Sequence, residues 1–370
     1  MKNVTYIISN IHKSLAFEWI AEGLDPKKFT VSFILLNPGD SELETFLRKN
    51  HFRVERVRYT GKKNIPKAVL KVYRILKRQK CDVVHTHLFD ANMVGLPAAK
   101  LAGVKKRVHT RHHSSYHHEY HPKAVRYDRY INRWSTHIIA ISEIVKKILV
   151  EKENVDPKKV RLVYHGFPLN SIYNQPENEV SELKKKYNPY SGRPVIGVIS
   201  RYTHWKGIQY IIPAFKELLK KHPDALLILA NANGEYSQEI KKQLHDLPHR
   251  NFTEIEFEHN IFALYKLFDV FVHVPINQQV EAFGQVYVEA LAAHVPSVFT
   301  LSGIANEFIE HGSNALVVNY GDSSAIYDAI DKILNDDNLK KTLVMNGVAS
   351  IQEKFELKKM ISSLENIYAE

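Results

Sequence analysis

Two carboxylates lie eight positions apart in the segment VEAFGQVYVEALAAHVPSV, residues 280–298. Glu281 follows the strand-like run DVFVHV, and Glu289 lies in an apolar run with helical spacing. A helix that begins at Gly284 would place unpaired backbone N–H groups and a partial positive charge beside them. This arrangement suits an anionic or polyhydroxylated ligand, and both carboxylates could reach one elongated molecule. The alternative is that the two carboxylates only stabilise the start of the helix.

A pair of cations follows a second apolar run. Arg201 and Lys206 come after PVIGVIS, in a loop that enters a predicted helix at Gly207. Cationic side chains next to the N-terminus of a helix favour a phosphate ligand. Without that context, a surface arginine and lysine are ordinary solvated charges. The pattern therefore indicates a site for an anionic ligand at this loop.

Histidines are concentrated in the first half of the chain, with twelve of the twenty before residue 171 and six within residues 109–121. A metal site is one interpretation of such density. However, the segment HTHLFDA lacks an H-x-H-x-D-H spacing, and the chain has no Asp-x-Asp pair to hold a metal–diphosphate complex. We therefore expect no metal and no other cofactor. The single cysteine, Cys81, is expected to be buried filler, since a lone thiol beside a strand is seldom a nucleophile.

These residues need a scaffold, and the hydrophobic pattern predicts one. Strand-like runs alternate with helical stretches over residues 1–168 and again over residues 193–352, which is typical of two Rossmann-like α/β domains. Residues 169–192 are polar and rich in Pro and Asn, and predict a linker. We expect the two domains to face each other across a cleft at the carboxyl ends of their strands.

The segment around Glu281 resembles the Glu-x7-Glu signature of the family-4 retaining glycosyltransferases, E-x-F-G-x-x-x-x-E-A-x-A-x-G-x-P-V. Residues 195–218 are similar to the first C-terminal strand and loop of that family, and residues 82–115 to its histidine-bearing strands. The signature departs from the family at His294 and Ser297, where Gly and Val are usual. It matches at Glu281, Phe283, Gly284, Glu289, Ala290, Ala292 and Pro296.

The resemblance implies the GT-B fold, with an acceptor-binding N-terminal domain and a nucleotide-sugar-binding C-terminal domain. A C-terminal helix at about residues 353–370 would pack back on the N-terminal domain. Arg201 and Lys206 would grip the diphosphate, Glu281 the sugar and Glu289 the ribose, while His112 would lie near the donor sugar. By the same resemblance, the donor site includes Phe283, Gly284 and Gln285, and the candidate acceptor-side residues are His12, Lys13, His85 and His87. The implied activity is that of a metal-independent hexosyltransferase, which would act in bacterial surface polysaccharide or glycoconjugate synthesis.

Charge separates the two halves. Residues 1–170 contain 32 Lys and Arg against 15 Asp and Glu, whereas residues 171–370 contain 19 against 25. Residues 61–80 hold eight basic residues and no acidic one, and residues 120–134 interleave Lys and Arg with Tyr and Trp. A solvated face explains such charge, but an anionic membrane surface suits it as well.

The interleaved residues favour a lipid-linked or glycan acceptor taken at the inner face of the membrane. No stretch has the roughly 18–20 apolar residues that span a bilayer, so we expect a cytoplasmic protein, peripheral at most. No recognised nucleic-acid motif accompanies the charge, and no nucleic acid is expected. Two other functions stay open from the sequence: a GT-B sugar-nucleotide epimerase, which needs no acceptor, and a basic nucleic-acid-binding protein.

Overall fold

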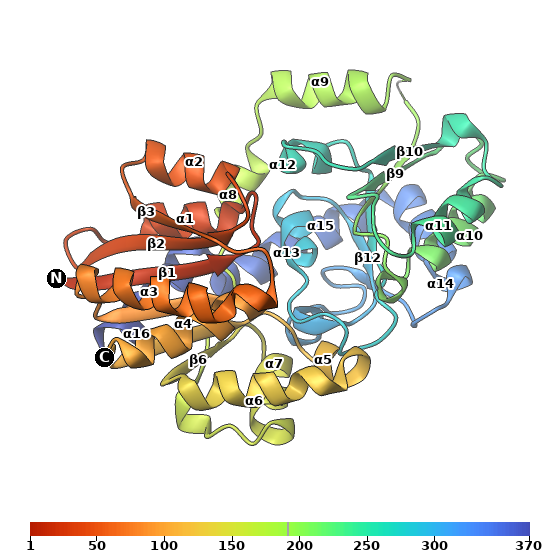
Figure 1. Cartoon of the computed structure of the whole chain (residues 1–370). Coiled ribbons are helices and arrows are strands. Elements are labelled where there is room, and N and C mark those ends of the chain that lie inside the picture. Colours follow the sequence, from red (N-terminus) through yellow and green to blue (C-terminus); the bar gives the residue numbers. More distant parts are fainter. Residues whose placement is uncertain (191) are drawn as a thin grey trace. The chain divides into compact units, whose positions relative to one another are not determined.

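The computed structural model describes residues 1–190 and 192–370 of the chain (Figure 1). The chain divides into two compact units. Unit 1 comprises Met1–Gly166 together with Leu357–Glu370, and unit 2 comprises Phe167–Glu356. Among the described residues, no helix has both the length and the apolar character needed to cross a membrane.

Unit 1 is built on a parallel sheet with the strand order β3-β2-β1-β4-β5-β6-β7. The first strand therefore lies near the centre and the chain winds outward in both directions, which is the Rossmann-like order expected from the sequence. The strands are β1 Lys2–Ser9, β2 Phe29–Asn37, β3 Arg53–Arg58, β4 Val83–His87, β5 Lys106–Arg111, β6 His137–Ala140 and β7 Val160–Leu162.

Helices cover both faces of this sheet (Figure 1). Successive residues of a strand point to opposite faces, and on β1 Ile7 packs in the core beneath α3 and α4, whereas Tyr6 contacts Tyr368 of α16. Helix α4 packs against both α3 and α6. The helices of unit 1 are α1 Leu15–Gly23, α2 Glu42–Lys49, α3 Ile65–Gln79, α4 Phe89–Leu101, α5 Tyr116–Tyr120, α6 Val125–Trp134, α7 Glu143–Lys147 and α16 Leu357–Ala369.

Unit 2 is also built on a parallel sheet, with the strand order β10-β9-β8-β11-β12-β13. Its core forms where α10 and α14 pack on the aliphatic face of the strands. The strands are β8 Val195–Ile199, β9 Leu226–Ala230, β10 Phe252–Ile255, β11 Val270–His273, β12 Ser297–Phe299 and β13 Leu316–Val317. The helices are α8 Leu169–Tyr173, α9 Glu177–Tyr187, α10 Ile208–Leu218, α11 Ser237–Leu244, α12 Ile261–Tyr265, α13 Gln285–Ala292, α14 Ser323–Asn335 and α15 Asp337–Phe355.

The segment predicted to be a linker, residues 169–192, differs from that expectation. It forms α8 and α9, and both helices pack within unit 2, against α12 and α13. The reason is that Leu169, Ile172 and Leu183 are buried, so a few well-spaced apolar side chains anchor a segment whose composition is otherwise polar. The change from unit 1 to unit 2 falls at Gly166 and Phe167.

The end of the chain returns to unit 1 through α16. The Tyr368 hydroxyl on this helix hydrogen-bonds to the Tyr6 hydroxyl and lies 2.6 Å from His85 Nδ1, and all three side chains are fully buried. Lys2 Nζ donates to the carbonyl oxygen of Tyr368 over 2.8 Å. A polar network inside the core therefore fixes the C-terminal helix on the sheet, because a buried hydroxyl without a partner costs free energy.

Candidate active site

The cations and carboxylates predicted in unit 2 come together because their strands are neighbours. β8 pairs directly with β11, so the loops that leave their carboxyl ends start side by side. The first loop carries Lys206, which ends a short 3-10 helix at His204–Lys206, and the second carries Glu281. Lys206 Nζ lies 2.5 Å from Glu281 Oε1. A lysine and a glutamate that the sequence assigned to different parts of a ligand are thus joined in a direct ion pair between two loops.

A histidine completes this ion pair. His273, the last residue of β11, places Nε2 3.1 Å from the same oxygen, Glu281 Oε1, and is itself buried. Burial by itself raises the pKa of Glu281, but the charge of Lys206 and the hydrogen bond from His273 outweigh it and hold that pKa well below its usual range. Glu281 is therefore an anion that already accepts two hydrogen bonds. His273 was not anticipated from the sequence, although its position at the carboxyl end of a predicted strand was a usable signal.

Two glycines make this close approach possible. Gly207 has φ +76°, and a Cβ on it would lie 1.9 Å from the carbonyl oxygen of Val274. Gly284 has φ +87°, and a Cβ on it would lie 2.5 Å from the ring of Tyr287. Both residues immediately precede a helix, α10 and α13 respectively, so left-handed backbone and the absence of a side chain bring helix N-termini to the site.

Arg201 lies on the same loop as Lys206 but is held differently. Its side chain is exposed, and it makes no hydrogen bond or ion pair with the rest of the described chain. A guanidinium without a protein partner is available for an external anion, and its fork geometry matches phosphate oxygens. Of the two cations predicted to bind the diphosphate, Lys206 is therefore held in an ion pair, whereas Arg201 is not.

Glu289 lies in the second turn of α13 and does not contact Glu281. Its Oε2 accepts a hydrogen bond of 2.9 Å from the Tyr265 hydroxyl, at the end of α12. Burial raises the pKa of Glu289 to about 7, and the hydrogen bond from Tyr265 opposes that rise only in part. The carboxyl thus titrates near neutrality, unlike Glu281.

The remaining predicted donor residues divide by exposure. Gln285, the first residue of α13, is exposed. Phe283 is buried, and its ring stacks on Phe167 at 6.2 Å and meets Phe355 edge-on at 5.8 Å. Its surroundings are those of a packing residue that fixes the start of α13, rather than those of a residue open to a ligand.

In unit 1, His112 belongs to a group of imidazoles at the carboxyl ends of β4 and β5. His112 Nε2 lies 3.0 Å from His87 Nδ1, and its ring stacks parallel to His165 at 5.8 Å. Burial, reinforced by the nearby His165, His85 and His113, holds the pKa of His112 well below its usual range, and burial lowers the pKa of His165 to about 4. His112 is therefore neutral at physiological pH and can donate or accept one hydrogen bond. His165 was not anticipated from the sequence.

His112 also lines a cavity of about 240 Å³ within unit 1. The cavity lies between α4, the end of β5, α5 and α6, and the larger part of its wall surface is apolar although polar side chains reach it. The lining residues are Leu88, Phe89, Asn92, His109, Thr110, Arg111, His112, His113, Tyr116, His117, Asp128 and Ile131.

The candidate acceptor-side residues occupy different environments. His85 is fully buried, and its ring nitrogens bond to Tyr368 and Thr110, so the geometry assigns it to the core rather than to a ligand. His87 is also buried. His12 and Lys13 follow β1 and both pair with Glu42, at 3.2 Å and 3.5 Å. Of the four, only these last two lie where a soluble ligand could reach their side chains.

The two Rossmann-like sheets and the loops at their carboxyl ends define a glycosyltransferase of the GT-B class, and the comparisons with known proteins agree. Residues 19–171 match the model of glycosyltransferase family 4, and residues 179–349 match that of the group 1 glycosyl transferases. The chain belongs to this family of glycosyltransferases, and its activity is that of a hexosyltransferase.

Several individual proteins are similar to most of the chain. The capsular polysaccharide biosynthesis glycosyltransferase CapM of Staphylococcus aureus is 26% identical over 82% of this chain and 80% of its own length. The N-acetyl-alpha-D-glucosaminyl L-malate synthase of Bacillus anthracis is 25% identical over 80% and 77%. The crystal structure of Anabaena HepE in complex with UDP-glucose superposes with a TM-score of 0.85, at 21% identity over 100% of both chains.

Proposed function

We propose that this chain is a retaining glycosyltransferase that moves a hexose from a nucleotide-diphosphate donor to a hydroxyl of a glycan or lipid-linked glycan. The observation that carries the proposal is the ion pair between Lys206 and Glu281, next to the N-terminus of α13 and the unpaired Arg201. No single one of these four groups would bind the whole donor. Together they offer cations for the diphosphate and a carboxylate for sugar hydroxyls.

The bound donor and Glu281 would both accept hydrogen bonds from Lys206. An ammonium group has three N–H donors, so Lys206 can keep one hydrogen bond to Glu281 and give another to a phosphate oxygen. Arg201 and the backbone N–H groups at the start of α13 would hold the other oxygens. Glu289, at the second turn of the same helix, would accept hydrogen bonds from the ribose hydroxyls. UDP-glucose is the first donor to test, because the similar HepE structure holds it.

The chemistry follows from where charge develops. Breaking the bond between the anomeric carbon and the phosphate oxygen puts positive charge on the sugar and negative charge on the leaving diphosphate, as in other glycosyl transfers. Lys206 and Arg201 stabilise the leaving group. Glu281 is engaged by Lys206 and His273, so we assign it to holding the sugar rather than to attacking it.

Retention then requires that the acceptor oxygen bonds to the same face that the phosphate leaves. In the step that we propose, the acceptor hydroxyl forms the new bond to the anomeric carbon while its proton passes to the departing phosphate oxygen. A neutral His112 would hydrogen-bond to a sugar hydroxyl and orient it. The reaction needs no metal ion in this scheme, because protein cations neutralise the diphosphate.

For the acceptor, we favour a glycan carried at an anionic membrane surface. CapM acts in capsular polysaccharide synthesis, whereas the Bacillus anthracis relative makes a malate glycoside, so the family relatives allow either class. The surface of unit 1 favours the first. On α6, Tyr127 and Tyr130 are 41% and 59% exposed, and Arg126, Arg129 and Arg133 are exposed beside them. Aromatic and basic side chains in this mixture suit a lipid interface.

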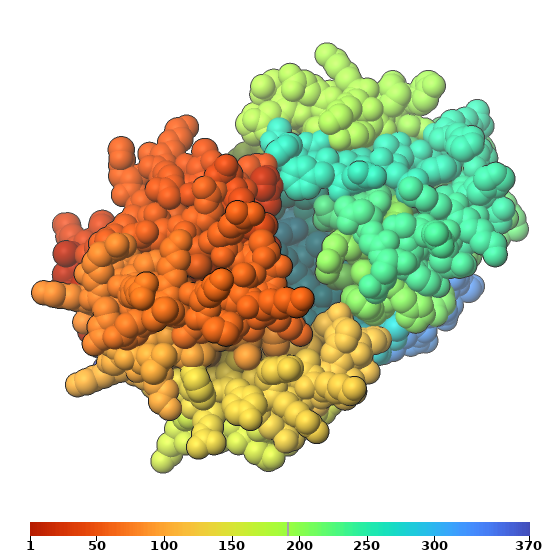
Figure 2. Space-filling model, viewed as in Figure 1, coloured from red at the N-terminus to blue at the C-terminus, as the bar shows by residue number. Residues whose placement is uncertain are grey.

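A second basic surface lies on α3, and both helices appear on the face shown in Figure 2, α3 in orange and α6 in yellow. The buried side of α3 holds Val72, Ile75 and Leu76. Its exposed side carries only basic charge, from Lys67, Lys71, Arg74, Lys77 and Arg78. Each basic residue near an anionic bilayer contributes about 1 kcal/mol, so several acting together give reversible binding.

The decisive experiment is a donor screen followed by product analysis. Thermal shift over UDP-, GDP- and ADP-sugars should find one nucleotide that stabilises the chain. The purified chain is then incubated with that donor, with and without extracted lipid-linked glycans, and the anomeric configuration of the product is read by NMR. Transfer with retained configuration supports the proposal. An inverted product contradicts retention, and conversion of the donor sugar without any acceptor would indicate an epimerase.

A further inference from the structure

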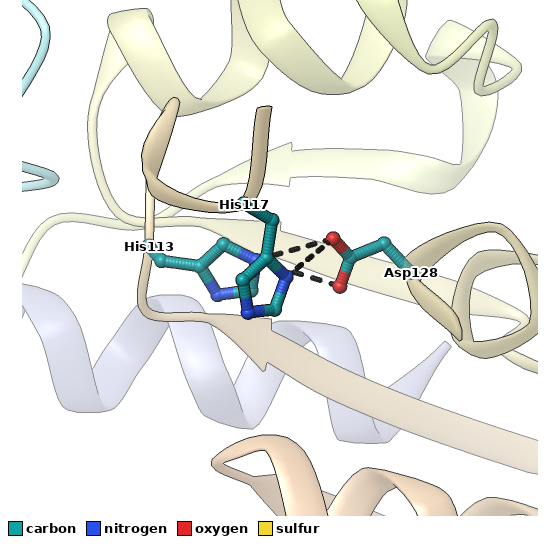
Figure 3. Close-up of side chains that lie close together, drawn as sticks. All are labelled: His113, His117 and Asp128. Carbon is teal, nitrogen blue, oxygen red and sulfur yellow. Dashed lines mark hydrogen bonds and ion pairs between the residues drawn. The ribbon is translucent and has the colours of Figure 1, made fainter. Parts of the chain in front are cut away.

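Three side chains that lie far apart in the sequence converge within unit 1 (Figure 3). His113 follows β5, His117 lies in α5, and Asp128 lies in α6. His117 Nδ1 is 2.7 Å from Asp128 Oδ2, and His113 Nε2 is 3.4 Å from both carboxylate oxygens. Both imidazoles point toward the carboxylate in Figure 3, and the three ligand atoms lie within 4.8 Å of one another.

The carboxylate at the centre is buried but incompletely satisfied. The Asp128 side chain is 0% exposed, and its Oδ1 accepts no hydrogen bond from the described residues. A buried carboxylate oxygen without a donor is costly, and a bound cation is one way in which native structures satisfy it. The two imidazoles remain partly accessible, with side-chain exposures of 24% for His113 and 12% for His117. A small ion can therefore reach the cluster.

The surrounding charges favour a cation. Arg111 is buried beside the cluster, but it pairs with Glu153 as well as with Asp128. Asn132 Nδ2 donates to Glu153 over 2.7 Å, which fixes that pair. With neutral imidazoles, the two carboxylates and one guanidinium leave a net charge of −1. Arg111 weakens the attraction for a cation without cancelling it, and it also orients Asp128 as the outer partners of metal ligands do.

We propose that His113, His117 and Asp128 form a binding site for a divalent first-row transition metal ion, with Zn²⁺ as its best-matched occupant. Two imidazole nitrogens and one carboxylate oxygen are the protein ligands of open zinc sites, which leave a fourth position for water or another oxygen ligand. Zn²⁺ at about 2.0–2.1 Å from each ligand requires ligand atoms roughly 3.4 Å apart. The His113–Asp128 spacing already has this value, and the shorter His117–Asp128 contact would open to admit the ion.

The fourth position has room. All three residues line the cavity of about 240 Å³ that His112 also lines, so an ion here would be open to a water molecule or to the hydroxyl of a bound molecule. The three residues differ from those to which the proposed function assigns the donor diphosphate, so metal binding can be measured without glycosyl transfer.

The first test measures metal binding by the full chain without a polyhistidine tag. The protein is stripped with EDTA, dialysed, loaded with Zn²⁺ or Co²⁺ and analysed by elemental mass spectrometry and visible absorption. We expect one tightly held ion per chain and Co²⁺ bands typical of four-coordinate nitrogen and oxygen ligands. The His117→Asn and His113→Asn variants should bind Zn²⁺ at least about tenfold more weakly.

The matched control is His121→Asn. His121 lies one turn beyond His117, is exposed and hydrogen-bonds to Tyr116; it meets the His117 ring only edge-on at 6.4 Å and does not reach the carboxylate, so its loss should leave Zn²⁺ affinity unchanged. Affinity that is equal in the native chain and in the His113→Asn/His117→Asn double variant overturns the proposal. Circular dichroism checks the fold of each variant. Should a variant unfold, anomalous diffraction from Zn²⁺-soaked crystals of the native chain decides: a peak between the three residues supports the site, and no peak or a peak elsewhere overturns it.

Discussion

Lys206 and Glu281 form an ion pair of 2.5 Å between two loops that leave neighbouring parallel strands, and His273 donates to the same carboxylate oxygen from 3.1 Å. The pair joins the residue proposed to hold the diphosphate to the residue proposed to hold the sugar. A change in either partner should therefore affect both ends of the donor.

Substitution of either cation should slow transfer strongly. Lys206→Ala and Arg201→Ala each remove one preorganised charge from the leaving group, so we expect turnover to fall by about 10²–10³-fold. Steady-state kinetics with the donor found in the screen measure this. The control is Lys220→Ala, which removes an exposed lysine that pairs with Glu217 in the helical region after the same loop. Rates within threefold of the parent for both site variants would contradict the assignment.

Donor affinity should rise with pH through about 7. Burial raises the pKa of Glu289 to about 7, and only the ionised carboxylate accepts hydrogen bonds from both ribose hydroxyls. Calorimetry with an intact nucleotide sugar is the measurement, since its phosphates do not titrate in this range, unlike a terminal phosphate. Tyr265→Phe removes the hydrogen bond that lowers this pKa and should shift the midpoint upward. An affinity that is flat between pH 6 and 8 would rule out the ribose role.

The Glu289 carboxyl should also lower the stability of the protein without bound nucleotide as the pH rises. A folded-state pKa of about 7, above the usual 4.5, means that the folded form favours the protonated carboxyl, so stability falls as pH rises from about 4.5 through 7. Glu289→Gln does not titrate. We therefore expect the variant to unfold at higher denaturant than the parent at pH 8, by a larger margin than at pH 5, while nucleotide affinity drops. Equal margins at both pH values would show that the group does not titrate as described.

The stacking of His294 on Tyr173 should stabilise the folded protein, although the backbone at position 294 favours glycine. His294 is the second residue after α13, with φ 63°, and its ring stacks on Tyr173 of α8 at 3.8 Å. His294→Ala keeps the left-handed backbone and loses the stack, which should cost about 1 kcal/mol. His294→Gly also loses the stack but relieves about 1–2 kcal/mol of backbone strain. Chemical denaturation should therefore find the Gly variant more stable than the Ala variant, and the reverse order would refute this account.

Binding to membranes should depend on anionic lipid and on the basic helices of unit 1. The full chain should co-sediment with anionic vesicles but not with neutral ones, and salt should weaken the binding. Reversing Lys71, Arg74 and Lys77 on α3 should reduce it severalfold. Reversing Lys241 and Lys242 on α11, in unit 2, is the control with a comparable loss of charge. Absence of binding at low salt would leave a soluble acceptor as the explanation.

Much of the fold was predictable because short-range patterns in the sequence specify its strands and helices. Alternating apolar strands and amphipathic helices identified two Rossmann-like sheets, and the helices expected to begin at Gly207 and Gly284 start one residue later, as α10 and α13. The segment 169–192 was the exception. Its polar composition concealed three buried apolar side chains, whose burial depends on the partners that α12 and α13 supply.

The sequence by itself placed Lys206 and Glu281 in loops that follow two predicted strands of the same domain, at the carboxyl ends where ligands bind in such sheets. Only the tertiary structure decided which partners these and other residues acquire. Tyr265 reaches Glu289, His85 is enclosed by the core, and Asp128 meets two histidines that lie 11 and 15 positions away. The reason is physical: sequence spacing sets the direction of a side chain within its own element, whereas contacts between elements depend on how the helices pack and rotate.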